Sequence, residues 1–243
     1  MIYYEKYGED SPGVIMFLHD MNFVHCFTKQ CAYFARKCEV IVPHIPGFGR
    51  NCEVTFSVDL AVEQISELAR SLKKPITLIG FSLGAELCIP LICKHGDLFN
   101  GVIMISPWLI KEMDEIEAVM KQQADNEKSM RKGDLGGSVG LSKMEKQEHK
   151  EFCKNVTMKS ILASIDNGLQ IADYPEFSEV TKPMMAICGL KESLSVRKST
   201  RELARLNQGC TYDMWDGAVH NIPYKFASRL NKTIEDFILQ LQL

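Results

Sequence analysis

One short stretch of the sequence, residues 76–89, limits the fold and the chemistry of this chain more than any other. It opens with an apolar run, the pattern of a buried strand, and closes with apolar residues at helical spacing. Between the two lies Gly80-x-Ser82-x-Gly84, which is typical of a sharp strand-to-helix turn that holds a serine hydroxyl clear of the sheet. Glycine has no Cβ and lets such a turn pack tightly, while the serine takes a strained backbone conformation. The stretch therefore predicts a strand, a tight turn and a helix, with Ser82 presented at the turn.

Patterns of buried strands and amphipathic helices alternate along most of the chain. Continuous apolar runs of strand length occupy residues 14–18, 40–42, 76–79, 102–105 and 184–188. Apolar residues at helical spacing occupy residues 23–37, 57–71, 85–95, 195–206 and 226–241. Residues 2–7 have the pattern of an edge strand, and residues 211–215 have the pattern of a last strand. Strands that alternate with helices predict an α/β fold, with a mostly parallel, doubly wound sheet covered by helices on both faces.

The alternation is interrupted in the middle of the chain. Residues 111–180 are rich in Lys, Glu, Gln and Met and contain no convincing strand pattern. Amphipathic helices are expected at residues 114–128 and 142–154, joined by the glycine-rich segment 133–140. Connections of this length in compact domains usually have a function.

We therefore divide the chain into a core and an insertion. Residues 1–108 and 181–243 form the predicted core, and residues 109–180 are interpreted as a helical cap, or lid, over the sheet. The alternative is that these residues are ordinary connecting structure.

The overall charge and the apolar runs exclude several kinds of partner. A formal net charge of −3 gives no electrostatic reason to expect nucleic acid or an anionic membrane. Residues 3–7 interrupt any apolar run near the N-terminus, so no signal peptide is expected, and no run is long enough to span a bilayer. We expect a cytoplasmic protein, a monomer or a homodimer, whose partner is a small molecule.

The nine cysteines do not follow a metal-binding or disulfide pattern. There is no Cys-x-x-Cys, and no Cys/His group has zinc-finger spacing. Cys31, Cys88, Cys93 and Cys188 fall in predicted helices or strands, where free cysteine behaves as a small apolar residue. An odd count fits reduced thiols in a reducing compartment. We expect neither a metal nor an organic cofactor.

Ser82 needs a base to take its proton, because a serine hydroxyl is a poor nucleophile by itself. His220 follows the predicted last strand, and the carboxyl ends of parallel strands share one edge of a sheet. A third group must orient the imidazole and stabilise its charged form. Glu192 lies just past the preceding strand and has the right position for this role. The alternatives for the acid are Asp173, Asp213 and Asp216.

The other histidines are weaker candidates for the base. His19 ends a strand but belongs to the turn after it, and His44 and His95 flank loops. His25 and His149 are expected to be solvated helix residues.

A negative oxygen that develops during acyl transfer needs two hydrogen-bond donors, the oxyanion hole. We expect one donor to be the backbone N–H of Leu83, at the start of the helix after the serine. The other should be the backbone N–H of Met21, in the turn after the first buried strand. The expected substrate contacts are His19, Phe81 and Trp108.

Taken together, these motifs resemble the α/β-hydrolase superfamily, in the group with a helical cap after the sixth strand of the family's sheet. The order serine, acid, histidine is the order of that family. The resemblance covers nearly the whole chain outside the cap and rests on Leu18-His19-Asp20, Pro46-Gly47-Phe48-Gly49-Arg50, Gly80-Phe81-Ser82-Leu83-Gly84, Gly189-Leu190-Lys191-Glu192 and Gly217-Ala218-Val219-His220. The short N-terminal part suggests that the family's first edge strand is missing.

Four positions depart from the family pattern. The family usually has Gly, Asp, Asp and Gly where this chain has Asp20, His44, Glu192 and Val219. None of these departures removes a catalytic group, since glutamate is an accepted alternative to aspartate in this fold.

The resemblance implies a serine hydrolase that cleaves a small carboxylic ester or related acyl compound through an acyl-enzyme. Carbon–carbon bond hydrolysis of a vinylogous diketone, thioester cleavage and perhydrolysis use the same triad and are alternatives. From a different class, the chain could be a non-catalytic binding module or a lyase, because fold does not determine function. Serine at position 82 argues against dehalogenase and epoxide hydrolase chemistry, for which aspartate would be expected.

Overall fold

The computed structural model describes residues 2–21, 23–131, 143, 147 and 157–241. Its centre is one seven-stranded sheet with the strand order β1-β3-β2-β4-β5-β6-β7. The strands are β1 (Tyr4–Tyr7), β2 (Val14–Leu18), β3 (Glu39–Pro43), β4 (Ile76–Phe81), β5 (Phe99–Ile105), β6 (Met184–Gly189) and β7 (Cys210–Trp215). All neighbours pair in parallel except β1, which runs antiparallel to β3. The predicted mostly parallel α/β sheet is confirmed.

The central strands are apolar along their whole length because helices cover both faces of the sheet. Every residue of β2 and β4 is buried, as expected for strands inside a parallel sheet. In the pairing register, Leu18 at the end of β2 lies opposite Gly80 near the end of β4. The loops that follow these two strands therefore leave the sheet side by side.

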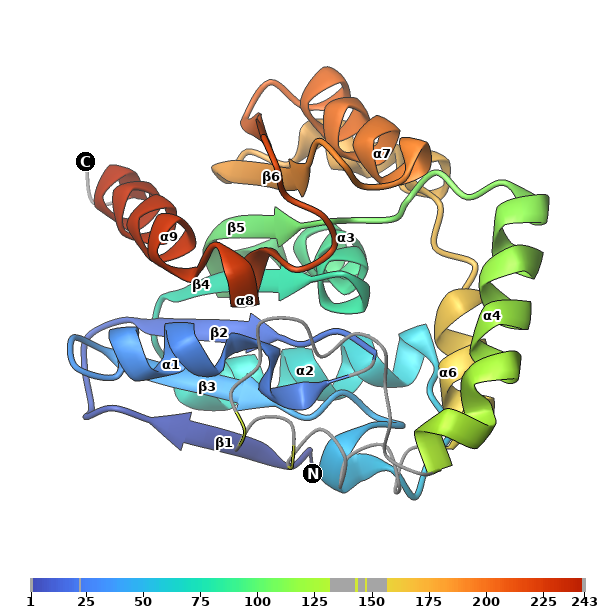
Figure 1. The fold of residues 1–243 in the computed structure, drawn as a ribbon. Helices are drawn as coiled ribbons and strands as arrows, with labels where there is room; N and C mark the ends of the chain where they lie inside the picture. The colour runs from blue at the N-terminus through green and yellow to red at the C-terminus, as the bar shows by residue number, and fades with distance from the viewer. Residues whose placement is uncertain (1, 22, 132–142, 144–146, 148–156, 242–243) are drawn as a thin grey trace.

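Eight described helices complete the fold (Figure 1). They are α1 (Thr28–Phe34), α2 (Val58–Leu72), α3 (Leu83–His95), α4 (Met113–Arg131), α6 (Met158–Ile165), α7 (Leu194–Leu206), α8 (Ile222–Lys225) and α9 (Ala227–Leu241). Apolar residues of α2 and α3 pack on one face of the sheet, and those of α1 and α9 pack on the other. None of the helices in the described part of the chain is long and apolar enough to cross a membrane.

Helix boundaries follow local signals in the sequence. The Ser57 hydroxyl accepts a hydrogen bond from the Leu60 N–H at 3.3 Å, so it caps α2 as expected. The helix expected at residues 23–37 is instead a 3-10 turn, Val24–Phe27, followed by the short α1. The eight described cysteines are all free thiols.

Between β5 and β6, none of the described residues belongs to a strand. The helix predicted at residues 114–128 corresponds to α4, whereas α6 was not predicted. The second predicted cap helix, 142–154, and the glycine-rich segment 133–140 lie outside the described residues, apart from residues 143 and 147. Figure 1 shows α4 and α6 side by side, beyond the end of the sheet at which the parallel strands terminate.

Candidate active site

Ser82 stands at a strained turn between β4 and α3. Its backbone has φ 54° and ψ −117°, a conformation that residues other than glycine rarely adopt. A Cβ on Gly80 would lie 2.2 Å from the carbonyl oxygen of Gly84. A Cβ on Gly84 would lie 2.1 Å from the carbonyl oxygen of Leu18. Both positions therefore require glycine, and the turn predicted from the sequence is present.

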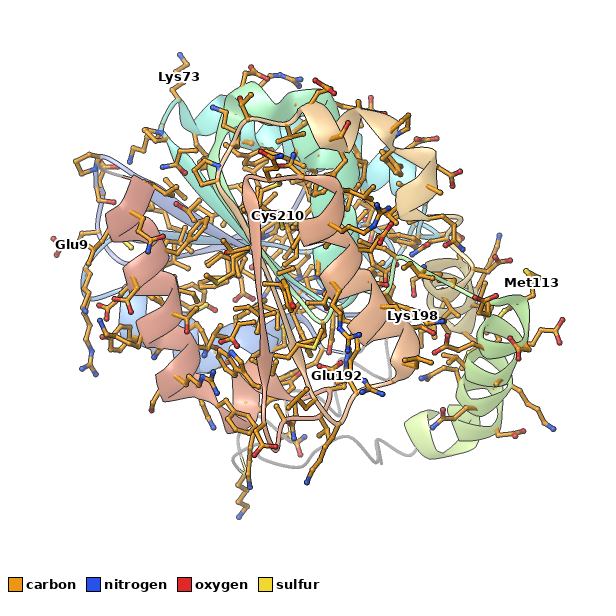
Figure 2. The ribbon with its side chains drawn as sticks, turned by 90° about the horizontal axis from the view of Figure 1, so that it is seen from above. Glu9, Lys73, Met113, Glu192, Lys198 and Cys210 are labelled. Carbon is orange, nitrogen blue, oxygen red and sulfur yellow. The ribbon has the colours of Figure 1, made fainter. Side chains whose placement is uncertain are left out.

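Glu192 and His220 meet at the same edge of the sheet, on the loops after β6 and β7. The distance from His220 Nδ1 to Glu192 Oε2 is 2.8 Å. The other carboxylate oxygen accepts hydrogen bonds from the Ser106 hydroxyl at 2.7 Å and from the Gly189 N–H at 2.8 Å. Figure 2 shows Glu192 beside the N-terminal end of α7. Two hydrogen bonds to Oε1 thus fix the carboxylate, and Oε2 is aimed at the imidazole.

The two partners shift each other's pKa. Burial opposes the charge of Glu192, but the hydrogen bonds from His220, Gly189 and Ser106 outweigh it and hold the pKa of the carboxyl below its usual range. Desolvation likewise opposes the positive charge of His220. The hydrogen bond to Glu192 and the attraction of its charge outweigh desolvation, so the pKa of the imidazole is raised. The pair therefore favours a carboxylate next to an imidazole that is a stronger base than usual.

The structure does not bring the three alternative acids to His220. Asp213 accepts hydrogen bonds from the Trp215 indole at 2.7 Å and from Arg229 at 3.0 Å. Asp216 is exposed and accepts from the Gly217 N–H at 2.9 Å. Asp173 is exposed in the 3-10 segment Ile171–Asp173. Of the four acids weighed from the sequence, Glu192 is the one hydrogen-bonded to His220.

The imidazole of His220 lies over the residue that precedes the serine. Its ring centroid is 4.8 Å from that of Phe81, whose side chain is fully buried. The His220 side chain remains 47% exposed, so one edge of the ring is open. Within the described part of the chain the Ser82 hydroxyl makes no hydrogen bond. The hydrogen bond between a nucleophilic serine and its histidine is often long or poorly aligned until substrate binds. Phe81 supports the imidazole, and its buried ring leaves no surface for the predicted substrate contact.

The two expected oxyanion donors also reach this edge. Leu83 is the first residue of α3, and the first N–H groups of a helix have no partner within it. Met21 follows β2, and its sulfur lies 3.3 Å from the Ser164 hydroxyl of α6, which donates to the Ile161 carbonyl oxygen at 2.7 Å. The α6 helix therefore contacts the loop that carries the second expected donor.

His19 is a structural part of that loop. It is fully buried, and its Nδ1 lies 2.6 Å from the carbonyl oxygen of Asp20. Its Nε2 accepts a hydrogen bond from the Ile45 N–H at 2.9 Å, which fixes the proton on Nδ1. Desolvation by burial lowers the pKa of His19 to about 3, so the ring is neutral. Both nitrogens are occupied by backbone groups, and the predicted contact of His19 with substrate is not supported.

Trp108, the third expected substrate contact, follows β5. Its side chain is partly buried, and its ring lies 5.0 Å from the ammonium of Lys111. The sequence predicted no role for Lys111 or for Ser106, whose hydroxyl positions Glu192. Their roles depend on contacts with residues far away in the chain, so no local pattern could have revealed them.

One further group of side chains has the composition of a metal site. Glu5 Oε1 lies 2.9 Å from His25 Nε2 and 3.1 Å from His44 Nε2. However, His44 Nδ1 accepts a hydrogen bond from the Arg50 N–H at 2.9 Å. A neutral His44 therefore carries its proton on Nε2, where a metal would need a lone pair. We interpret the group as a hydrogen-bonded network around Glu5.

Known structures show the same fold. No protein-family model matches the chain, and no curated protein matches its sequence. A bromoperoxidase from Bacillus anthracis is 17% identical with a TM-score of 0.80, over 98% of this chain and 95% of that one. A carboxylesterase structure from the thaumarchaeon Nitrososphaera gargenis is 13% identical with a TM-score of 0.82, over 99% and 95%. MenH from S. aureus is 16% identical with a TM-score of 0.77, over the full length of both chains. The chain has the α/β-hydrolase fold.

Proposed function

We propose that this protein is a serine hydrolase that cleaves a small carboxylic ester or related acyl compound. The observation that carries the proposal is the 2.8 Å contact between the buried Glu192 carboxylate and His220, next to the strained turn of Ser82. A buried carboxylate that orients an imidazole beside a strained serine is the arrangement that nucleophilic acyl transfer requires.

The proposed reaction proceeds in two halves. His220 Nε2 takes the proton of the Ser82 hydroxyl as its oxygen attacks the substrate carbonyl carbon, and the carbonyl oxygen becomes negative. The N–H groups of Leu83 and Met21 stabilise that oxygen. The proton then passes from His220 to the departing alcohol, which leaves an ester on Ser82. Water activated by the same imidazole hydrolyses this ester and releases the acid.

We further propose that residues 109–180 form a cap that shapes the substrate site. Two contacts support this division of the chain. The Ser164 hydroxyl of α6 reaches the sulfur of Met21, and the Ser160 hydroxyl accepts a hydrogen bond from the Phe56 N–H at 3.2 Å. Both contacts join α6 to loops of the core, and the first lies at the expected oxyanion hole.

Labelling with a fluorophosphonate probe tests the nucleophile without knowledge of the substrate. We expect the probe to label Ser82 in the wild type and to leave Ser82→Ala unlabelled. A panel of p-nitrophenyl esters of increasing acyl length then tests the substrate class. Labelling without ester turnover would favour thioester or carbon–carbon cleavage instead. A wild-type protein that the probe does not label would point to a binding module.

A further inference from the structure

A buried ion pair joins the nucleophile helix to the segment after β5. Lys111 Nζ lies 2.7 Å from Glu86 Oε2, and the two side chains are 1% and 5% exposed. The same ammonium donates to Asn167 Oδ1 at 2.6 Å and lies 3.5 Å from the carbonyl oxygen of Ile165. Asn167 in turn donates to Glu86 Oε2 at 2.7 Å. We call these three side chains the Glu86–Lys111–Asn167 cluster.

The pairing of the two charges has no obvious reason in stability alone. A buried ion pair adds little compared with a well-packed apolar pair, because both charges lose their hydration. The three N–H donors of Lys111 are directed at Glu86, Asn167 and Ile165, so the ammonium is fully engaged. Removing one charge would leave the other uncompensated at this depth. The cluster therefore fixes the positions of α3, Lys111 and the end of α6 relative to one another.

The cluster lies one helical turn from the proposed nucleophile. The Glu86 N–H donates to the carbonyl oxygen of Ser82 at 3.0 Å, in the first turn of α3. An uncompensated carboxylate at this place would oppose the negative charge that develops on a substrate oxygen near Leu83. The same charge reaches the proposed base. Burial acts to lower the pKa of His220, but Glu192 outweighs burial, so the pKa is raised. Asp20 and Glu86 raise it further, by smaller amounts.

We propose that Lys111 is a positioning residue of the hydrolytic site, a role that rests on the proposed function. It holds the Glu86 carboxylate in a charge-neutral pair, and through Asn167 it fixes the base of the cap against the nucleophile helix. Three carboxylates on three elements raise the pKa of His220: Glu192 after β6, which contacts the ring, and, more weakly, Asp20 after β2 and Glu86 in α3. Lys111 compensates the one that lies on the helix of the proposed oxyanion donor.

Three variants separate this role from a merely structural one: Lys111→Met, Glu86→Gln and the double variant. The readout is the rate at which a fluorophosphonate probe labels Ser82, measured as a function of pH. In Lys111→Met we expect the rate at neutral pH to fall by roughly tenfold and the acid limb of the profile to move to higher pH. In Glu86→Gln the acid limb should move to lower pH. The acid limb of the double variant, which has neither charge, should return close to that of the wild type.

Lys232→Met is the matched control, because Lys232 forms an exposed pair with Asp236. It should change neither the rate nor the profile. If Lys111→Met does not fold, the acid limbs of Glu86→Gln and the double variant decide the question, because they differ in the charge at position 111. Equal acid limbs in wild type, Glu86→Gln and the double variant would overturn the role of Lys111. No labelling of the wild type would instead overturn the proposed function.

Discussion

Replacing Glu192 by glutamine tests the site sharply, because the structure determines which way the new amide must point. Glu192 Oε1 accepts hydrogen bonds from the Gly189 N–H at 2.8 Å and from the Ser106 hydroxyl at 2.7 Å. A backbone N–H can act only as a donor, so the glutamine oxygen has to take this position. The amide nitrogen is then directed at His220 Nδ1, where Glu192 Oε2 now lies at 2.8 Å.

An amide NH2 group also acts only as a donor, so His220 Nδ1 must become the acceptor. The ring proton then sits on Nε2, which has no lone pair left to take the proton of Ser82. We expect the rate of acylation to fall by up to about 10⁴, as for the same acid-to-amide change in serine proteases. This loss corresponds to about 5.4 kcal/mol of transition-state stabilisation.

The assay is the rate of fluorophosphonate labelling together with turnover of p-nitrophenyl esters. Glu192→Asp should be milder than Glu192→Gln, because it keeps a carboxylate and changes its reach by about one bond length. Asp213→Asn is the matched control, because the Asp213 carboxylate accepts hydrogen bonds from Trp215 and Arg229 and makes none with His220. Near-wild-type rates in Glu192→Gln, with a collapse in Asp213→Asn or Asp216→Asn, would refute the assignment of the acid.

Three further predictions follow from the same geometry. Gly84→Ala places a Cβ 2.1 Å from the carbonyl oxygen of Leu18 and should lower the free energy of unfolding by about 1–3 kcal/mol in urea titrations. Gly96→Ala, whose Cβ would meet nothing closer than 3.8 Å, should not. Because the pKa of His220 is raised, the labelling rate should increase with pH around a midpoint above the ordinary 6.5, and a midpoint at or below that value would contradict the role of Glu192. The pKa of Glu192 is lowered on folding, so its contribution to stability is present above the ordinary 4.5 and is lost as the pH falls through the lowered pKa. Glu192→Gln should therefore reduce the acid sensitivity of unfolding, measured by urea midpoints across this range.

The sheet could be predicted from the sequence because its central strands are buried on both faces. Such strands are continuous apolar runs, and β2, β4 and β5 all have this pattern. The edge strand β1 was expected at residues 2–7 and spans Tyr4–Tyr7. Only a boundary changed, which is where local signals are weakest.

The α6 helix was not predicted, and its composition explains why. It has eight residues, and two of its buried positions are Ser160 and Ser164, which make its inner face look polar. The Ser160 hydroxyl accepts a hydrogen bond from the Phe56 N–H, and the Ser164 hydroxyl contacts the Met21 sulfur; only the folded chain creates these two contacts. The Thr157 hydroxyl accepts from the Ser160 N–H at 3.2 Å, so a capping signal was present in the sequence.

Some residues of the candidate site could likewise be predicted from the sequence, and others could not. Ser82, Glu192 and His220 could be placed because each follows a strand, and the ends of parallel strands share an edge. Ser106 also follows a strand, yet its bond to Glu192 spans 86 positions of the chain. Lys111 lies in a charge-rich segment, where a lysine is normally a solvated residue. Its partner Glu86 lies in a helix that is otherwise apolar up to Lys94 and His95 in its last turn, which was the signal available for a buried ion pair.

The arrangement of charge around His220 gives a physical reason for burying a lysine in this fold. Each carboxylate near the imidazole makes it a stronger base but also leaves less of it unprotonated at neutral pH. Asp20 accepts a hydrogen bond from the Phe23 N–H at 2.6 Å and adds negative charge beside the loop of Met21. Glu86 would add a second such charge at the helix that carries the proposed Leu83 donor. Because the Lys111 ammonium lies 2.7 Å from the Glu86 carboxylate, the pair acts as a dipole instead of a full negative charge. His220 therefore keeps the raised pKa that Glu192 gives it, and no full negative charge opposes the substrate oxygen in the proposed oxyanion hole.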